Sequence, residues 1–347
     1  MIPKEVSKRI NILRIILLAF IIFSHNNSSA INNTTLSYYT KMLFSEILMR
    51  MAVPLFFLIS GFLLFRKPED YGKMLKKKAK TLLVPYLLWN IIVIAMFWVG
   101  QNAPYISRYF TDENNLISQY TLFRWLDAFL GLNYHGYPAA YQLWFIRDLM
   151  VLTLLYPMWR WLLQRFPVAL FAVLISLWLL EWRFVFLDGE ATLFFLMGAW
   201  LVQHNPGLEK LDSLRIRDIL AGYMLCVILE MGLVMNDRTF IAVHKIVVLM
   251  GGVLWLRLSK EIVSHNGLYT KINAFGGYTF FVYAFHEPLL TMMRKAWTML
   301  IGNEGTAIQM TQYFSLIFLA ITIPLCVGWC LRRISPGLYG LLTGGRA

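Results

Sequence analysis

Apolar runs of about 20 residues recur along the whole chain, and polar residues gather in the segments between them. A helix of roughly that length crosses the hydrocarbon layer of a bilayer. We therefore predict an all-α, polytopic helical bundle that forms a single domain over residues 1–347. Its predicted spans are residues 10–25, 42–65, 81–100, 143–163, 168–187, 191–203, 218–235, 240–258, 274–293 and 312–331.

Composition agrees with a membrane protein. Hydrophobic residues make up 58% of the chain and charged residues only 15%, whereas soluble domains carry about 25% charged residues. The three cysteines lie in apolar segments without metal-ligand spacing, so we predict no metal site. The first apolar segment is followed by no small-residue cleavage site, and we expect it to remain as a helix.

Most of the Lys and Arg residues behind the net charge of +13 lie in the loops between the predicted spans. With a cytoplasmic N-terminus, 21 Lys and Arg residues fall on the inner side, including Arg9 and the run around Lys77. Seven fall on the outer side, including Lys41 and Arg294, and four fall within spans. The positive-inside rule therefore predicts that both termini are cytoplasmic, and it explains the charge without a nucleic-acid partner.

The stretch "RIILLAFIIFSH" places Arg14 and His25 at the two ends of an apolar helix. Eleven residues at about 100° each leave the two side chains about 20° apart, and about 16 Å apart along the axis. Asn11 joins the same face. Charged side chains inside a membrane usually face a partner or a polar cavity. The alternatives are an Arg14 that extends to the cytoplasmic headgroups and a His25 that meets water at the outer surface.

Further ionisable residues lie within the predicted spans. Glu46 and Arg50 are four residues apart, so they can pair on one helix face, either in a site or as a structural ion pair. Arg147 and Asp148 are adjacent and are expected to point to different sides and to need different partners. His286 lies in "FVYAFHEPLL". A lone histidine there is more often a core residue, but a second intramembrane histidine favours a site.

The basic segment "GKMLKKKAKTLLVPY" has two interpretations. It lies where the positive-inside rule requires charge. It also suits the docking of a polyanionic cytosolic ligand, because lysines bind phosphate as point charges.

Four features together resemble the acyltransferase 3 family of integral membrane proteins, which acylate cell-surface glycans and lipids. The first is the spacing of Arg14 and His25, and the second is "PLFFLISGFLLF" with Ser60 and Gly61. The third is the basic segment that leads into "PYLLWN", and the fourth is "LWFIRDL" with the late "VYAFHEP". Their order extends over almost the whole chain.

This resemblance implies an acyl-CoA donor, usually acetyl-CoA, that approaches from the cytoplasm, and a saccharide acceptor. No bound cofactor is expected. The arginine and histidine of the first span are the family residues most closely tied to activity, which points to Arg14 and His25. The family often has an arginine-x-x-arginine pattern before Pro-Tyr, where this chain has Lys77 and Lys80. Lysine keeps the charge but loses the bidentate fork of arginine.

Acyl transfer to a hydroxyl needs a base, donors for the developing oxyanion, and exclusion of water. His25 is our first candidate for the base and His286 the second, with a covalent acyl-histidine relay left open. Arg14 is expected to hold the pantetheine or phosphate part of the donor, and Arg147 and Asp148 to orient the site. Ser60 and Gly61 offer a small surface either for a ligand or for helix packing.

The outer segment "YHGYPAAYQLW" suits an interfacial aromatic belt or a platform for sugar rings. The alternative function is a transporter or flippase of a glycan or lipid-linked sugar, because buried charge also marks transport pathways. We see no inverted repeat. We expect a bacterial inner-membrane protein in contact with lipids, and acetyl and succinyl donors both remain open.

Overall fold

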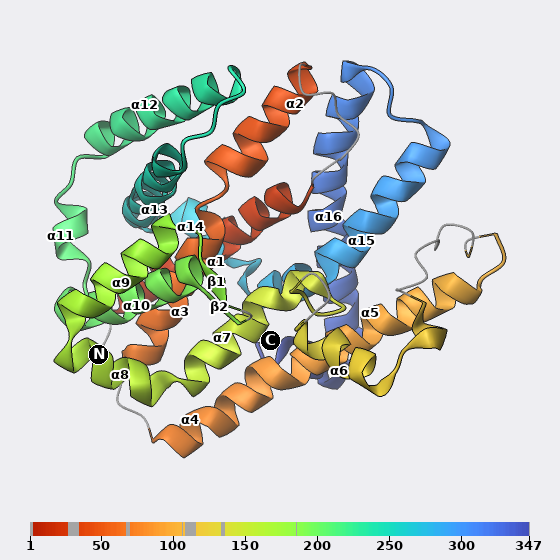
Figure 1. Cartoon of the computed structure of the whole chain (residues 1–347), viewed down its shortest axis with the longest axis horizontal. Coiled ribbons are helices and arrows are strands. Elements are labelled where there is room, and N and C mark those ends of the chain that lie inside the picture. Colours follow the sequence, from red (N-terminus) through yellow and green to blue (C-terminus); the bar gives the residue numbers. More distant parts are fainter. Residues whose placement is uncertain are drawn as a thin grey trace. The chain divides into compact units, whose positions relative to one another are not determined.

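The computed structural model describes residues 3–26, 35–66, 70–105, 107, 116–132, 136–184 and 186–346. Within these residues the chain is helical, except for one two-stranded hairpin (Figure 1). The elements are α1 (Lys4–His25), α2 (Leu36–Lys41), η1 (Met42–Leu48), α3 (Ala52–Phe65), α4 (Tyr71–Lys78), η2 (Ala79–Leu83), α5 (Val84–Asn102), η5 (Ile117–Gln119), α6 (Leu122–Leu130), η6 (Tyr141–Leu143), α7 (Trp144–Leu154), α8 (Tyr156–Arg165), α9 (Pro167–Leu179), β1 (Arg183–Phe184), β2 (Leu187–Asp188), α10 (Gly189–His204), α11 (Glu209–Asp212), α12 (Ile216–Val234), α13 (Ile241–Ser264), α14 (Asn266–Asn273), η7 (Gly276–Tyr278), α15 (Thr279–Leu300), α16 (Thr306–Ile334) and α17 (Pro336–Thr343). Here η1 and η2 are π-helical, and η5, η6 and η7 are 3₁₀ turns.

The chain forms two compact units. The first unit contains residues 1–68, 156–182 and 188–329, and the second contains residues 69–155, 183–187 and 330–347. Both predicted histidines, together with Arg14, belong to the first unit. The predicted basic segment before Pro85 and the pair at residues 147 and 148 belong to the second.

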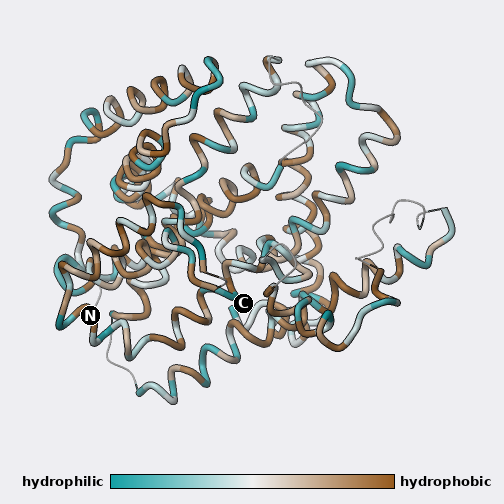
Figure 2. The backbone as a smooth tube through the Cα atoms, viewed as in Figure 1, coloured by the Kyte–Doolittle hydropathy of each residue, from teal (hydrophilic) through white to brown (hydrophobic). Residues whose placement is uncertain are grey.

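The helices confirm an all-α membrane protein. Four helical stretches are long and apolar enough to cross a bilayer: residues 36–65, 71–102, 241–264 and 306–334. A fifth candidate combines α8 and α9, which bend by 116° where they meet. Apolar residues run along most of the helical trace (Figure 2). Each of the ten predicted segments overlaps at least one helix, but the number of spans and the side of the termini remain predictions.

One predicted boundary is wrong. We expected a span over residues 168–187, but α9 ends at Leu179 and a short hairpin follows at β1 and β2. Glu181 has a positive φ of 51°, which turns the chain out of the helix. The segment is mostly apolar, as a helical span would be. Among its described residues only Glu181 has a positive φ.

Several helices begin where a side chain can accept a hydrogen bond from the first turn. Asp70 accepts from the backbone N–H of Lys73 at the start of α4, and Asp188 accepts from that of Glu190 at the start of α10. Such caps satisfy backbone donors that have no partner inside the helix. Gly131, with a φ of 64°, ends α6 in the left-handed conformation that glycine adopts readily.

Glycines allow α3 and α10 to pack closely in the first unit. A Cβ atom on Gly61 would lie 1.8 Å from the carbonyl oxygen of Phe195, and a Cβ atom on Gly198 would lie 1.9 Å from that of Leu58. The backbones of the two helices therefore touch, as small residues permit in membrane bundles. Of the two interpretations of Ser60 and Gly61, this contact supports helix packing for Gly61.

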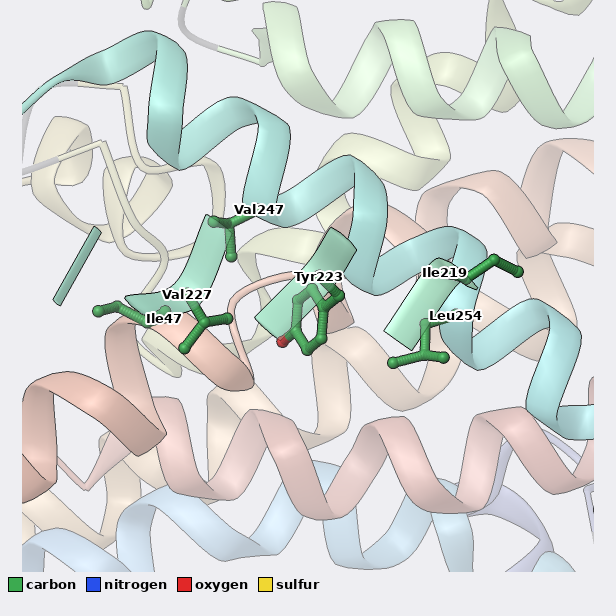
Figure 3. Close-up of a cluster of buried hydrophobic side chains, with 6 residues drawn as sticks. All are labelled: Ile47, Ile219, Tyr223, Val227, Val247 and Leu254. Atoms are coloured by element: carbon green, nitrogen blue, oxygen red, sulfur yellow. The ribbon is translucent and has the colours of Figure 1, made fainter. Parts of the chain in front are cut away.

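A cluster of buried apolar side chains joins α12 and α13 to η1 (Figure 3). The hydroxyl of Tyr223 donates to the carbonyl oxygen of Leu48 at 3.3 Å. That bond gives the aromatic ring a polar partner at its outer end. The cluster consists of Ile47, Ile219, Tyr223, Val227, Val247 and Leu254.

Arg9 links α1 to α11 and α13. Its Nε donates to Ser259 Oγ at 3.0 Å, its Nη1 lies 3.0 Å from Asp212 Oδ2, and its Nη2 donates to the carbonyl oxygen of Leu256 at 2.8 Å. The side chain is 2% exposed. We had counted Arg9 among the inner loop charges, but three internal partners make it a structural residue.

We predict that Gly198→Val abolishes stable folding, because the new side chain would have to separate α10 from α3. Gly232→Ala on α12 is the matched control, since a Cβ atom there meets no heavy atom within 4 Å. Alanine in an exposed helix gains up to about 1 kcal/mol over glycine. Thermal unfolding in detergent should show a large loss for the first variant and an unchanged or raised Tm for the second. Equal Tm values would contradict the close contact.

Candidate active site

The site lies at the C-terminal end of α1, where neighbouring helices hold the last turn. Ser45 Oγ donates to the carbonyl oxygen of Phe23 at 2.7 Å, and it also lies 2.8 Å from the hydroxyl of Tyr313. Asn26 Nδ2 donates to the carbonyl oxygen of Tyr313 at 2.8 Å. His25 lies between these two anchored residues, next to Ser24, so η1 and α16 together fix its position.

The two predicted histidines meet in the structure. The ring of His25 contacts the ring of His286, which lies on α15, with centroids 5.2 Å apart and planes inclined by 61°. His286 is 0% exposed and His25 is partly buried. Sequence reasoning named both residues as candidate bases, but it could not show that their rings touch. Among the described residues, no group of three or more His, Cys, Asp or Glu side chains is arranged to hold a metal ion.

The hydrogen bonds of His286 determine which nitrogen carries its proton. Nδ1 lies 2.6 Å from the carbonyl oxygen of Tyr283. A carbonyl oxygen only accepts, so Nδ1 donates and the neutral ring has its lone pair on Nε2. Nε2 is buried and has no hydrogen-bond partner among the described residues. This is the protonation state that a general base requires.

Arg294 caps α1 from a neighbouring helix. Its Nη2 donates to the carbonyl oxygen of His25 at 3.1 Å, which satisfies one of the carbonyls that a helix end leaves without a partner. A cation also suits the negative end of the helix dipole. Arg50 and Arg294 both lie close enough to interact electrostatically with His25. Lys41 interacts in the same way with Glu46 and Arg294.

Arg14 lies on the same regular helix as His25, as predicted, because α1 is continuous from Lys4 to His25. The helix geometry places the two residues on one face, about 16 Å apart along the axis. Arg14 is partly buried, and it forms no hydrogen bond, ion pair or ring contact with any described residue. Asn11, expected on this face, is exposed.

Comparison with known families decides the class of protein. The model of the acyltransferase 3 family, described as an acyltransferase domain, matches residues 7–331. The chain belongs to this family. It is an acyltransferase, and the matched range includes the histidine pair and Arg14.

One curated relative aligns over almost the whole length. The succinoglycan biosynthesis protein ExoH of Rhizobium meliloti (strain 1021) is 28% identical over 355 residues, which cover 99% of this chain and 93% of the relative. No solved structure matches the chain.

The expectation that Arg147 and Asp148 of the acyltransferase need different partners is wrong. Arg147 Nε donates to Asp148 Oδ1 at 2.8 Å, because a long arginine side chain can fold back onto its neighbour. Its Nη1 also donates to the carbonyl oxygens of Leu130, at 3.0 Å, and Gly136, at 2.9 Å. Arg147 therefore ties α7 to the end of α6 within the second unit.

Glu46 and Arg50 do not form the predicted pair. Neither side chain makes a hydrogen bond or ion pair with any described residue. The reason is local: η1 is π-helical and ends at Leu48, so the regular spacing of an α-helix does not hold between them. Arg50 instead lies in electrostatic range of His25.

The remaining predicted residues have simpler surroundings. Ser60 Oγ donates to the carbonyl oxygen of Phe56 at 2.7 Å, within its own helix. Lys77 and Lys80 are exposed on α4 and η2. In the aromatic segment that was predicted to be outer, Tyr134 and His135 lie outside the described residues, and Tyr137 contacts Tyr141.

Sequence reasoning missed Arg294 and Lys41, which we had counted as outer loop charges. Arg294 lies inside α15, eight residues after His286, and Lys41 is buried at the end of α2. The only sequence signal was that α15 continues as a helical pattern beyond Pro288. A longer predicted helix would have placed Arg294 on the element that carries His286.

We predict that Arg294→Gln lowers kcat about 10- to 100-fold, because hydrogen bonds to charged groups contribute about 1.5–3 kcal/mol and this one positions His25. Arg294→Lys should recover part of the rate, since it keeps the charge. The exposed neighbour Lys295→Gln is the control. A fall in Tm with unchanged kcat in Arg294→Gln would show that the contact serves stability alone.

Proposed function

We propose that this acyltransferase transfers an acetyl or similar short acyl group from acyl-CoA to a hydroxyl of a cell-surface or lipid-linked saccharide. The observation that supports this function most strongly is the contact between His25 and His286. His286 has a buried basic nitrogen, Nε2. The ring of His25 contacts the ring of His286 and lies at the C-terminal end of α1, which is bonded to η1, α15 and α16. Acyl transfer to a weakly acidic hydroxyl requires such a base.

The proposed reaction has a simple balance. A histidine of the pair takes the proton from the saccharide hydroxyl, and the oxygen attacks the thioester carbonyl carbon. The new C–O bond forms and the C–S bond breaks, and the proton then passes to the CoA sulfur. A relay through an acyl-histidine divides the same transfer into two steps, with the imidazole as the first acceptor. Arg50 and Arg294 supply positive charge near the developing oxyanion.

The donor is proposed to contact cationic groups. Arg14 suits this role because its partly buried guanidinium makes no hydrogen bond or ion pair with a described residue, which leaves it available to the phosphate or pantetheine portion of CoA. Lys77 and Lys80, which belong to the second unit, are exposed, and their binding to a polyanionic ligand stays a separate prediction. With the cytoplasmic N-terminus that the charge distribution predicts, Arg14 lies on the cytoplasmic side of His25.

The acceptor is proposed from the relative. A protein of succinoglycan biosynthesis aligns over 99% of this chain, which supports a polysaccharide or its lipid-linked precursor as the acceptor. A multi-pass protein of the bacterial inner membrane would place the histidine end of α1 towards the outer surface. Glycan acylation at that surface is compatible with a donor that approaches from the cytoplasm.

We predict that label from radioactive acetyl-CoA or succinyl-CoA enters surface glycan in cells with the wild-type protein and is reduced at least 100-fold by His25→Ala, within the range for loss of a general base. Arg14→Ala should also reduce the label, because it removes a charge that is proposed to bind the donor. Matched controls are His265→Ala and Arg217→Ala, because both side chains are exposed. Membrane expression must be equal for all variants.

Three outcomes would change the proposal. Full activity in His25→Ala would leave His286 as the base. Full activity in Arg14→Ala would remove that residue from donor binding. Glycan export that continues without any acyl-CoA, and without label in the product, would favour the transporter.

A further inference from the structure

Three cationic side chains lie around the C-terminal end of α1. Both η1 and α15 pack against α1, and Arg294 Nη2 of α15 donates to the carbonyl oxygen of His25 at 3.1 Å. Arg50, which follows η1, interacts electrostatically with His25, as Arg294 does. Lys41, at the end of α2, interacts in the same way with Arg294. A further cation of α15, Lys295, is exposed to solvent and is not counted.

The carboxylates of the same elements do not balance these cations. Among the residues of α2, η1 and α15, which the structure describes in full, the acidic side chains are Glu46 and Glu287. Glu46 interacts electrostatically with Lys41, and Glu287 is 2% exposed. The undescribed residues 27–34 contain no charged residue. With both imidazoles neutral, as a base requires, the three cations exceed the two carboxylates by one charge.

An unbalanced positive charge is costly inside an apolar helical bundle. Lys41 and Arg50 both belong to the candidate span over residues 36–65. Arg50 makes no hydrogen bond or ion pair with any described residue, and Arg294 Nε is buried without a hydrogen-bond partner among them. An oxyanion develops only in the transition state, so it cannot balance this charge before the reaction. A reactant with a permanent negative charge can.

The reactant that must lie beside His25 during transfer is the acyl group. The phosphates of CoA are proposed to bind at Arg14, about 16 Å away along α1, and the thioester is at the opposite end of the pantetheine arm. A dicarboxylic acyl group such as succinyl ends in a carboxylate. Three C–C bonds, or less than about 4.5 Å, separate that carboxylate from the thioester carbon. Arginine can bind a carboxylate through two parallel hydrogen bonds.

We propose that Arg50 and Arg294, supported by Lys41, form an anion subsite beside His25 that binds the free carboxylate of a dicarboxylic acyl group. This inference rests on the proposed function and names its acyl group. The carboxylate takes no part in the bond changes. The saccharide oxygen still forms the ester bond, the C–S bond still breaks, and CoA leaves as the thiol. An acetyl group has no charge to offer this subsite, so the subsite selects between the two donors.

The test compares donors that differ in this charge. Purified protein in detergent is given radiolabelled succinyl-CoA, its neutral amide analogue succinamyl-CoA, or acetyl-CoA, with the deacylated surface polysaccharide of the host as acceptor. The amide keeps the shape of the succinyl group and removes the negative charge. The variant is Arg50→Gln, because Arg294 also holds His25. Arg50→Lys keeps the charge, and Arg217→Gln is the control, since the side chain of Arg217 is 83% exposed.

The wild type should use succinyl-CoA with a kcat/KM at least about tenfold above that of the amide analogue, as expected for a hydrogen-bonded charge pair. Arg50→Gln should bring this ratio to within about threefold of one, mainly through a raised KM for succinyl-CoA. Arg50→Lys should retain most of the preference, and Arg217→Gln all of it. A role of Arg50 at the oxyanion alone would lower kcat for all three donors by the same factor, so the ratio separates the two roles.

A wild-type ratio near one would overturn the inference, and so would a preference that Arg50→Gln leaves unchanged or equal losses for all three donors. If Arg50→Gln does not fold, the wild-type ratio decides alone. Equal use of both succinyl donors, with a preference for native over carboxyl-reduced polysaccharide, would place the anion on the acceptor and contradict the proposal. Each of these results leaves the proposed function standing. Wild-type protein that transfers label from none of the donors would overturn the proposed function, and this subsite with it.

Discussion

The site depends on how α1 ends. A helix leaves its last carbonyl groups without internal partners, and inside an apolar bundle water does not supply them. Here two of these carbonyl groups have partners from other elements: Phe23 accepts from Ser45 of η1 and His25 accepts from Arg294 of α15, while the Asn26 side chain donates to the carbonyl oxygen of Tyr313 on α16. Each bond satisfies a backbone group or an adjacent side chain, and together they fix the backbone of His25. The ring contact with His286 follows from that fixed backbone, because α15 supplies both the cap and the second histidine.

Hydrogen bonds and ion pairs within the chain distinguish structural charged residues from candidates for function. Arg9 and Arg147 each bond to at least three groups of the chain, so removing either would take hydrogen-bond donors from buried carbonyl oxygens and a cation from a carboxylate. Arg14 has no such bond with a described residue. Burial of a polar group alone carries little information, and a buried polar atom without a partner calls for an explanation.

Much of this arrangement could be predicted from the sequence. The apolar runs gave the helices, and the eleven-residue spacing gave the shared face of Arg14 and His25. What the sequence could not give is any contact between distant segments, such as residue 25 with residue 286. Local irregularities were also hidden: the π-helical turn of η1 separates Glu46 from Arg50, and one positive φ at Glu181 ends a predicted span early. The pairing of Arg147 with Asp148 was missed because helix spacing gives the direction in which each side chain leaves the backbone. It does not show that a long arginine side chain can fold back onto its neighbour.

The most direct test of the account is a double-mutant cycle on the histidine pair. His25→Ala and His286→Asn would be measured singly and together for kcat at equal membrane expression, with Tm as a check on folding. Asparagine can keep the donor to the carbonyl oxygen of Tyr283 while it removes the base. If the two rings act as one unit, the double variant should be about as slow as the slower single variant, because residues that act together are strongly non-additive. Losses that multiply fully, or a single variant with wild-type kcat, would contradict a catalytic pair.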